Sequence, residues 1–147
     1  MKERPYIHLY NTMILQTRRG TSRNGGVINA KPIFVLTLIE VIRRGVFSNN
    51  KVFFNDSLKG VYNGLYSKYN PDLSIAPIYL PFYFLTGDGY WHIKWHKEQS
   101  PTYHPTMKML RENAEYGYLD NALWDLLQDE EIRQFFEKQI INYFLSK

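Results

Sequence analysis

The segment AKPIFVLTLIEVIRRG (residues 30–45) is apolar on nearly every side of a helix. A helix with this pattern is usually buried inside a domain, because it has no polar face to turn toward water. Pro32 suits the first helical turn, and Gly45 is a residue type that commonly ends a helix. Arg43 and Arg44 complement the negative end of the helix dipole. The segment therefore predicts a central buried helix around which the rest of the domain packs.

Amphipathic patterns predict further helices on both sides of this segment. Two stripes of apolar residues at helical spacing follow Pro5 and Asp56, and Asp56 is expected to cap the second of these helices. The first stripe comprises Tyr6, Leu9, Tyr10, Met13 and Ile14, and the second comprises Leu58, Val61, Tyr62, Leu65, Tyr66 and Tyr69. Three more helices are expected to start near or at capping residues: Thr106, Asp120 and Asp129.

Two segments have the character of strands. VFSNNKVFF (residues 46–54) places β-branched and aromatic residues around an Asn-Asn pair, which indicates a short strand or hairpin. Farther along, a Gly-Asp-Gly turn at residues 87–89 separates the aromatic runs 83–85 and 90–95, which predicts a β-hairpin. Together the elements predict the α+β class, with five or six helices around a small antiparallel sheet or hairpin, in a single domain spanning residues 1–147.

Composition limits the classes of function. The 147-residue chain contains no cysteine, which excludes a disulfide framework, a thiolate zinc site and a cysteine nucleophile. No apolar run follows the initial MKERPY, so no secretory signal is expected. The longest apolar stretch, residues 33–42, is too short to span a bilayer. We therefore expect a cytoplasmic protein with no membrane partner.

Charge is unevenly distributed along the chain. The net charge is +4, yet residues 1–60 carry ten basic and three acidic residues, whereas residues 61–147 carry eight and eleven. A basic half joined to a mildly acidic half suggests a surface for a polyanion such as nucleic acid. Ordinary solvated surfaces show the same asymmetry, so charge alone does not decide the partner.

No catalytic arrangement is evident. His92 and His96 have a spacing that suits metal ligands on a helix, but on the expected strand they lie ~13 Å apart. The sequence has no Gly-x-Ser-x-Gly motif, no Walker loop and no paired carboxylates at a plausible cleft. We therefore expect a binding function with no catalytic residue, no metal and no cofactor. An enzyme that uses His92 or His96 with a metal remains an alternative.

A basic, glycine-rich segment, TRRGTSRNGG (residues 17–26), precedes the central helix. Its arginines can fork onto phosphate, and its glycines let the backbone approach a ligand closely. It leads to the helix start, where the dipole favours an anion and where Lys31 stands in place of an acid. The expected phosphate-binding residues here are Arg18, Arg19, Arg23 and Lys31. The alternative is a solvated loop, with Ser22, Asn29 or water capping the helix.

An aromatic segment, APIYLPFYF (residues 76–84), has few polar side chains. Its rigid, proline-punctuated sequence suits an apolar contact surface near the basic segment. That surface is expected to comprise Tyr79, Leu80, Pro81 and Phe84. The alternative is a buried strand packed on the central helix.

Three segments carry a resemblance to a known family: NAKPIFVLTLIEVIRRG, LPFYFLTGDGYWHI and YLDNALWDLLQDEEIRQFFEKQIINYF. In this order, from about residue 29 to 144, they resemble the N-terminal, non-catalytic DNA-recognition domain of bacterial HNH-type restriction endonucleases. The best-understood members are the sulfur-binding domains of McrA-type modification-dependent enzymes, which bind phosphorothioate DNA. The resemblance implies double-stranded DNA as the partner and a separate C-terminal HNH nuclease module outside this chain.

The resemblance also relates five positions to a sulfur-binding cup. A family His-Arg pair before the helix-opening proline corresponds to Ala30 and Lys31, so one cation is retained and the histidine is lost. A Tyr-Pro pair corresponds to Leu80 and Pro81. A small family alanine corresponds to Phe84, which is expected to fill the space that the sulfur would occupy.

These observations predict the DNA-binding recognition module of a restriction or defence endonuclease. A further family cation corresponds to Lys108 or Arg111, and both join the expected phosphate contacts. The resemblance supports DNA binding more strongly than sulfur specificity, because Phe84 replaces a small residue. The alternative from a different class is a protein–protein interaction domain with a tyrosine-rich surface. The oligomeric state is left open.

Overall fold

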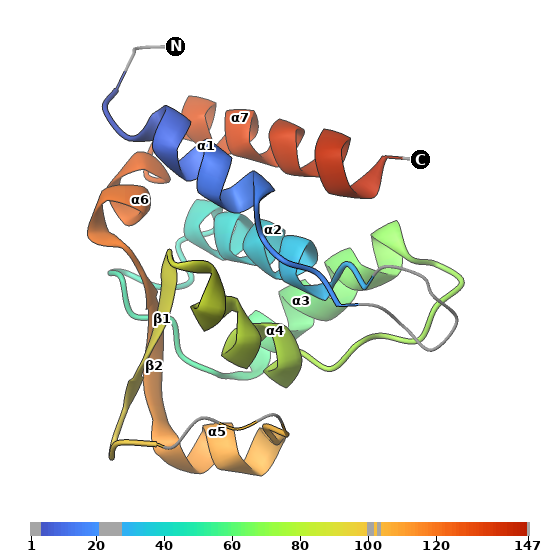
Figure 1. The fold of residues 1–147 in the computed structure, drawn as a ribbon, viewed down its shortest axis with the longest axis vertical. Coiled ribbons are helices and arrows are strands. Elements are labelled where there is room, and N and C mark those ends of the chain that lie inside the picture. The colour runs from blue at the N-terminus through green and yellow to red at the C-terminus, as the bar shows by residue number, and fades with distance from the viewer. Residues whose placement is uncertain (1–3, 21–27, 100–101, 103, 147) are drawn as a thin grey trace.

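The computed structural model describes residues 4–20, 28–99, 102 and 104–146. Over these residues the chain forms seven α-helices and one two-stranded antiparallel sheet (Figure 1). The helices are α1 (Ile7–Leu15), α2 (Ala30–Arg43), α3 (Asp56–Tyr69), α4 (Tyr79–Phe84), α5 (Met107–Asn113), α6 (Asn121–Leu126) and α7 (Glu130–Ile140). A 3₁₀ turn (Leu85–Asp88) follows α4, a π turn (Ile141–Leu145) follows α7, and the strands are β1 (Trp91–Trp95) and β2 (Ala114–Leu119). The predicted class, mainly helical α+β, is confirmed.

Helix α2 lies in the centre of the molecule, between α1 and α7 on one side and α3 and α4 on the other (Figure 1). Eleven of its fourteen residues are buried, as its sequence predicts. Phe34 makes edge-to-face contacts with the rings of Phe82 and Trp91, at centroid distances of 5.9 and 5.3 Å. Over the described residues, no helix combines the length and the apolar character needed to cross a bilayer.

The inward face of α1 differs from the predicted stripe. Tyr6 and Leu9 are 57% and 51% exposed. The buried residues are Ile7, Tyr10 and Ile14, which also lie at helical spacing. Several apolar residues in this segment fit a helical period, and only packing against α7 decides which of them turn inward.

Four helices begin at or next to the residues predicted to cap them. Thr106 and Asp129 cap α5 and α7 with their side-chain oxygens, as expected. Helix α3 is capped by Asn55, and Asp56 is its first residue, so the predicted cap is one position too late. Asp120 occupies the position before α6 but makes no capping hydrogen bond, because its carboxylate binds other side chains.

The predicted hairpin around residues 87–89 is wrong. Residues 79–84 form α4, and β1 pairs with β2, with Trp91 opposite Leu119. A short apolar run does not separate strand from helix by its period. Here the helical form buries Phe82 and turns its carbonyl toward the Trp91 indole N–H, which donates to it at 2.8 Å.

Residues 46–54 do not form the predicted strand or hairpin. They contribute one isolated bridge, in which Val52 pairs with Gly117 of β2. Gly117 is required there, because a Cβ at this position would collide with the ring of Trp91. The sheet therefore rests on the central aromatic core through a glycine that leaves room for the indole.

Candidate functional site

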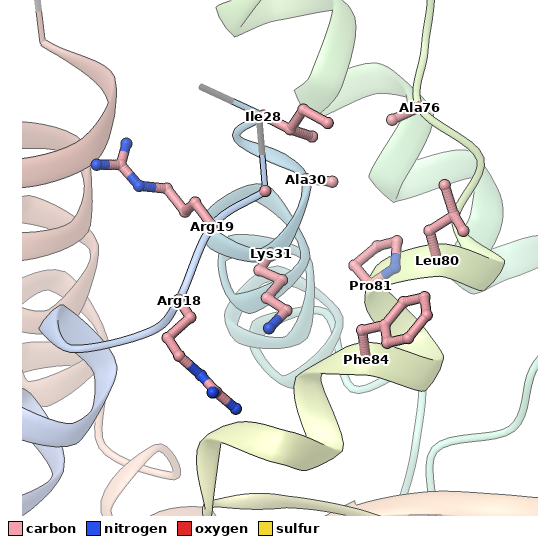
Figure 2. A pocket seen from close by; sticks show the side chains of 10 residues that line it. Arg18, Arg19, Ile28, Ala30, Lys31, Ala76, Leu80, Pro81 and Phe84 are labelled. Atoms are coloured by element: carbon pink, nitrogen blue, oxygen red, sulfur yellow. The ribbon is translucent and has the colours of Figure 1, made fainter. Parts of the chain in front are cut away.

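A pocket opens between the segment that follows α1, the first turn of α2, and α4 (Figure 2). Its volume is about 460 Å³. Its basic residues are Arg18, Arg19 and Lys31. Its remaining wall is formed by Gly20, Ile28, Ala30, Ala76, Leu80, Pro81 and Phe84. Cations and apolar side chains that lie up to 66 positions apart in the sequence thus face one cavity.

Lys31 is paired with an acid inside the protein. Its Nζ donates to Asp88 Oδ2 at 2.7 Å, and the side chains of Lys31 and Asp88 are only 17% and 4% exposed. From the sequence, no acid was expected to neutralise the start of α2. The structure contradicts this expectation, because Asp88 lies there. The 3₁₀ turn after α4 carries Asp88 back to the first turn of α2, so the Lys31 ammonium is held in place before any ligand binds.

Arg18 contacts the same carboxylate mainly through its backbone. Its N–H donates to Asp88 Oδ1 at 3.0 Å, and its Nε lies 3.9 Å from that oxygen. One guanidinium N–H reaches the Gly87 carbonyl at 3.4 Å. The Arg18 side chain is nevertheless 78% exposed, so the backbone is fixed while the guanidinium stays accessible to an anion.

Arg19 lies at the edge of the pocket. Figure 2 shows its side chain directed away from Leu80 and Phe84. Its guanidinium carbon lies 4.8 Å from the centre of the Phe144 ring, and its NH1 donates to Asn29 Oδ1 at 3.1 Å. Asn29 precedes α2 without capping it through its side chain. The capping role considered for Asn29 is therefore replaced by an anchor for Arg19.

The apolar wall comes mainly from α4. Leu80, Pro81 and Phe84 face the cavity from the side opposite Lys31 (Figure 2). Phe84 forms one wall of the cavity and does not close it. Its ring packs edge-to-face on Tyr83, with centroids 5.1 Å apart. The neighbouring Tyr79 is half-buried against the core and does not line the pocket.

The other predicted cations lie elsewhere or outside the described residues. Lys108 is 83% exposed on α5, and its Nζ is 4.0 Å from a Glu112 oxygen. Arg111 lines a separate small cavity beside the start of α3. Arg23 lies outside the residues that the structure describes. The pocket therefore joins six of the ten residues proposed from the sequence.

Sequence reasoning missed Asp88, Ile28 and Ala76 at this site. Asp88 was interpreted only as part of a turn, because nothing local reveals a partner 57 positions away. Ala76 belongs to the aromatic segment but has too small a side chain to attract notice. Ile28 lies two residues before the start of α2, and this position was the only available signal.

A second polar cluster surrounds His92. Its Nε2 lies 2.5 Å from Asp120 Oδ1, while the Tyr10 hydroxyl donates to Asp120 Oδ2 at 2.8 Å. Burial and the hydrogen bond to Asp120 raise the pKa of Tyr10 to about 12, so this hydroxyl stays protonated at neutral pH. Within the described parts of the chain, no group of three or more His, Asp or Glu side chains is arranged to hold a metal.

Solved structures share this architecture over nearly the whole chain. The sulfur-binding domain of SprMcrA, complexed with phosphorothioated DNA, superposes with a TM-score of 0.73 at 18% identity. The match covers 98% of this chain and 87% of that domain. The chain has the fold of a sulfur-binding domain.

Larger structures contain a domain of the same fold. The sulfur-binding and SRA domains of ScoMcrA with phosphorothioated DNA match with a TM-score of 0.71 and 17% identity, over 92% of this chain and 42% of that one. The type IV phosphorothioation-dependent restriction endonuclease ScoMcrA matches with a TM-score of 0.68 and 16% identity, over 91% and 29%. This chain therefore spans less than half of these longer proteins. The sequence matches no protein-family model and no curated protein.

Proposed function

We propose that this chain is the DNA-recognition module of a restriction or defence endonuclease, and that its pocket receives one backbone phosphate of double-stranded DNA. The observation that carries the proposal is the pocket itself. It sets Arg18 and Lys31 against an apolar wall, on a fold shared with the sulfur-binding domains of SprMcrA and ScoMcrA, both complexed with phosphorothioated DNA. Contacts to backbone phosphates supply essentially all of the affinity for non-specific DNA and a large share of the affinity for specific sites.

The basic side of the pocket suits the charge of the phosphate. Arg18 combines a fixed backbone with an accessible guanidinium, which can donate two hydrogen bonds to phosphate oxygens. Lys31 keeps its pairing with Asp88 and presents the rest of its ammonium to the cavity. The start of α2 adds the positive end of a fourteen-residue helix dipole. Arg19 serves a neighbouring phosphate at the edge.

The apolar side suits sulfur better than oxygen. Sulfur is larger and more weakly hydrated than oxygen, so transferring it from water to an apolar wall costs less. Leu80, Pro81 and Phe84 provide such a wall without closing the cavity. The proposal therefore includes a preference for phosphorothioate over unmodified DNA. Cleavage is assigned to a nuclease module outside these 147 residues, not to this chain.

The test compares three duplexes of one sequence: unmodified, with a single Rp phosphorothioate, and with a single Sp phosphorothioate. Dissociation constants are measured by fluorescence anisotropy at one fixed salt concentration. One phosphorothioate diastereomer is expected to bind at least about tenfold more tightly than the other two duplexes, a difference of ~1.4 kcal/mol.

A matched pair of variants shows whether the preference for phosphorothioate DNA depends on the apolar wall of the pocket. Leu80→Gln places an amide in the apolar wall and is expected to remove most of the preference for sulfur. Leu73→Gln makes the same change at a residue that is 61% exposed and outside the pocket, and it should leave the preference intact. Equal binding of all three duplexes, or an unchanged preference in Leu80→Gln, contradicts the assignment of this wall.

A further inference from the structure

The sheet has a solvent-facing side that the core does not use. In β1 and β2 successive side chains point to opposite faces. Trp91 is fully buried and Gly117 lies against its ring, so these two residues define the inward face. On the opposite face, His92 pairs with Tyr118, and exposed Lys94 pairs with Tyr116.

Aromatic rings form a continuous row across this outward face. The centroid distances are 6.2 Å from Phe53 to Tyr116, 5.9 Å from Tyr116 to Tyr118, and 5.1 Å from Tyr118 to His92. Phe53 is 46% exposed. Phe53 contacts the buried Phe47, with ring centroids 6.2 Å apart, but neither tyrosine belongs to the set of apolar side chains packed on the core. Core packing therefore does not account for the two tyrosines.

Lysines accompany the rings. Lys51 Nζ lies 5.2 Å from the centre of the Tyr116 ring, and Lys94 extends from the neighbouring strand opposite the same tyrosine. Of the acids near this face, Asp120 has both carboxylate oxygens occupied by His92 and Tyr10, and Glu115 is exposed in β2 next to Tyr116. The face thus combines aromatic rings with two lysines.

The row ends at a cavity of about 360 Å³. Its lining combines the rings of Tyr118 and His92 with polar groups of Asp120 and Asn121. The Asn121 Oδ1 accepts from the Asn50 amide at 3.1 Å. In the described part of the chain, the Asn121 NH₂ group makes no hydrogen bond of its own. This NH₂ group can therefore donate hydrogen bonds to the edge of a planar, polar ligand.

We propose that this face binds single-stranded nucleic acid. Unpaired bases stack on Tyr116, Tyr118 and His92, and one base enters the cavity beside Asn121. Lys51 and Lys94 contact the flanking phosphates. Every base offers a π-face, so a row of rings accompanied by cations binds single strands with little sequence preference. Hydrogen bonds to the edge of the base in the cavity add the specificity that stacking lacks.

This face is separate from the pocket between α2 and α4. The two sites have no lining residue in common, and they lie on different elements. In Figure 1 the sheet runs along one side of the lower half of the molecule, from near α6 down to α5, with α4 beside it. The two proposals can therefore fail independently. Loss of single-strand binding with intact duplex binding tests only the sheet face.

The experiment measures anisotropy of two labelled oligonucleotides of equal length, one of thymidines and one of abasic sites, at a fixed salt concentration. The abasic strand has the same phosphates but no bases. The intact chain is expected to bind the thymidine strand at least about tenfold more tightly, since stacking on even one ring gives about this factor. Variants of the sheet face should keep the affinity of the intact chain for the phosphorothioate duplex. This control shows that the pocket between α2 and α4 is unaffected by the substitutions.

Substitutions test whether the rings cause the difference. Tyr116→Leu with Tyr118→Leu keeps apolar, strand-compatible side chains and is expected to remove the preference for bases. Tyr116→Phe with Tyr118→Phe retains the rings and should preserve it. Tyr143→Leu changes a tyrosine that is 62% exposed after α7, away from the row, and should have no effect.

Three results overturn the proposal. Equal affinity for the thymidine and abasic strands reduces the interaction to charge alone. An unchanged preference in the leucine pair shows that the bases bind elsewhere. Absence of single-strand binding, with self-association on size exclusion that the leucine pair abolishes, assigns the face to a second copy of the chain.

Discussion

At the scale of single residues, Asp88 connects the two segments that supply the cations of the pocket. Its carboxylate accepts from the Lys31 ammonium and from the Arg18 backbone, and its side chain is only 4% exposed. Removing one member of a buried pair leaves the other charge uncompensated, which is strongly destabilising. Asp88 therefore positions the basic side of the pocket and also stabilises the fold.

Asp88→Ala is expected to lower the free energy of unfolding by about 3 kcal/mol, because it leaves Lys31 without a counter-charge. The measurement is urea denaturation followed by circular dichroism. Lys31→Met in the same chain removes the uncompensated ammonium and should recover part of the loss. If the double variant is no more stable than Asp88→Ala, the ion pair is not the source of the effect.

Gly117 permits a close contact that no other residue allows. A Cβ there would overlap the Trp91 ring, so Gly117→Ala should lower the free energy of unfolding by about 1–3 kcal/mol, the usual cost of overpacking. Gly64→Ala in α3 is the matched control, because its Cβ has no neighbour within 4 Å. Higher helix propensity should make that control neutral or stabilising, by up to ~1 kcal/mol. If both variants lose a similar amount of free energy of unfolding, the overlap with the Trp91 ring is not the cause of the loss in Gly117→Ala.

The residue scale also shows what the sequence could not reveal. Arg18, Arg19 and Lys31 were recognised from charge and position, because a basic segment at a helix start is a local feature. The partner of Lys31 was not, because Asp88 reaches it only through the tertiary fold. The Gly-Asp-Gly sequence indicated a turn correctly but gave no information about where the carboxylate points.

At the scale of elements, α2 and α7 are joined by a network around Arg43. Its guanidinium donates to Glu40, Glu130 and Glu137. Hydrogen bonds from Arg43 and then Arg133 lower the pKa of Glu130 to about 2. Burial raises the pKa of Glu40, but hydrogen bonds from Arg44 and Arg43 outweigh it and leave this pKa below its usual value. Both carboxylates are therefore more acidic in the folded chain than in the unfolded one.

The pH dependence of stability follows from these directions. A carboxylate whose pKa is depressed by folding stabilises the protein above its unfolded pKa and loses that contribution as pH falls through the folded one. For Glu130 this window runs from the ordinary 4.5 down to about 2. The melting temperature should therefore fall as pH decreases through this window, and less steeply in Arg43→Gln. Parallel pH profiles of the two proteins in calorimetry would contradict this role of the network.

Elements differed in how well the sequence predicted them. Residues 30–43 are apolar all round and long enough that only a buried helix fits, and this prediction is confirmed. Residues 79–84 are too few for their period to separate strand from helix, and here the prediction failed. The helical form is favoured because it lets the Phe82 carbonyl accept a hydrogen bond from the Trp91 indole N–H. The position of Trp91 is set by the sheet and not by the segment itself.

At the scale of the whole molecule, the fold explains why distant segments form one pocket. The central helix brings its first turn beside α4, and the segment after α1 passes in front of α2 (Figure 1). The ordered motifs in the sequence indicated a resemblance to sulfur-binding domains, and the structural match over 98% of the chain confirms that fold. At 18% identity, however, the ligand has to be inferred from the pocket and tested by binding.

The salt dependence of binding to an unmodified duplex tests the central claim, phosphate contact through the basic residues of the pocket, most directly. Each phosphate neutralised contributes about −0.9 to the slope of log affinity against log salt. Arg18→Gln with Arg19→Gln should therefore make the slope shallower by about 1.8, while Lys97→Gln with Lys138→Gln, which removes the same charge from exposed residues outside the pocket, should not. A slope that is unchanged in the arginine pair, or equally reduced in both pairs, would contradict DNA binding through this pocket.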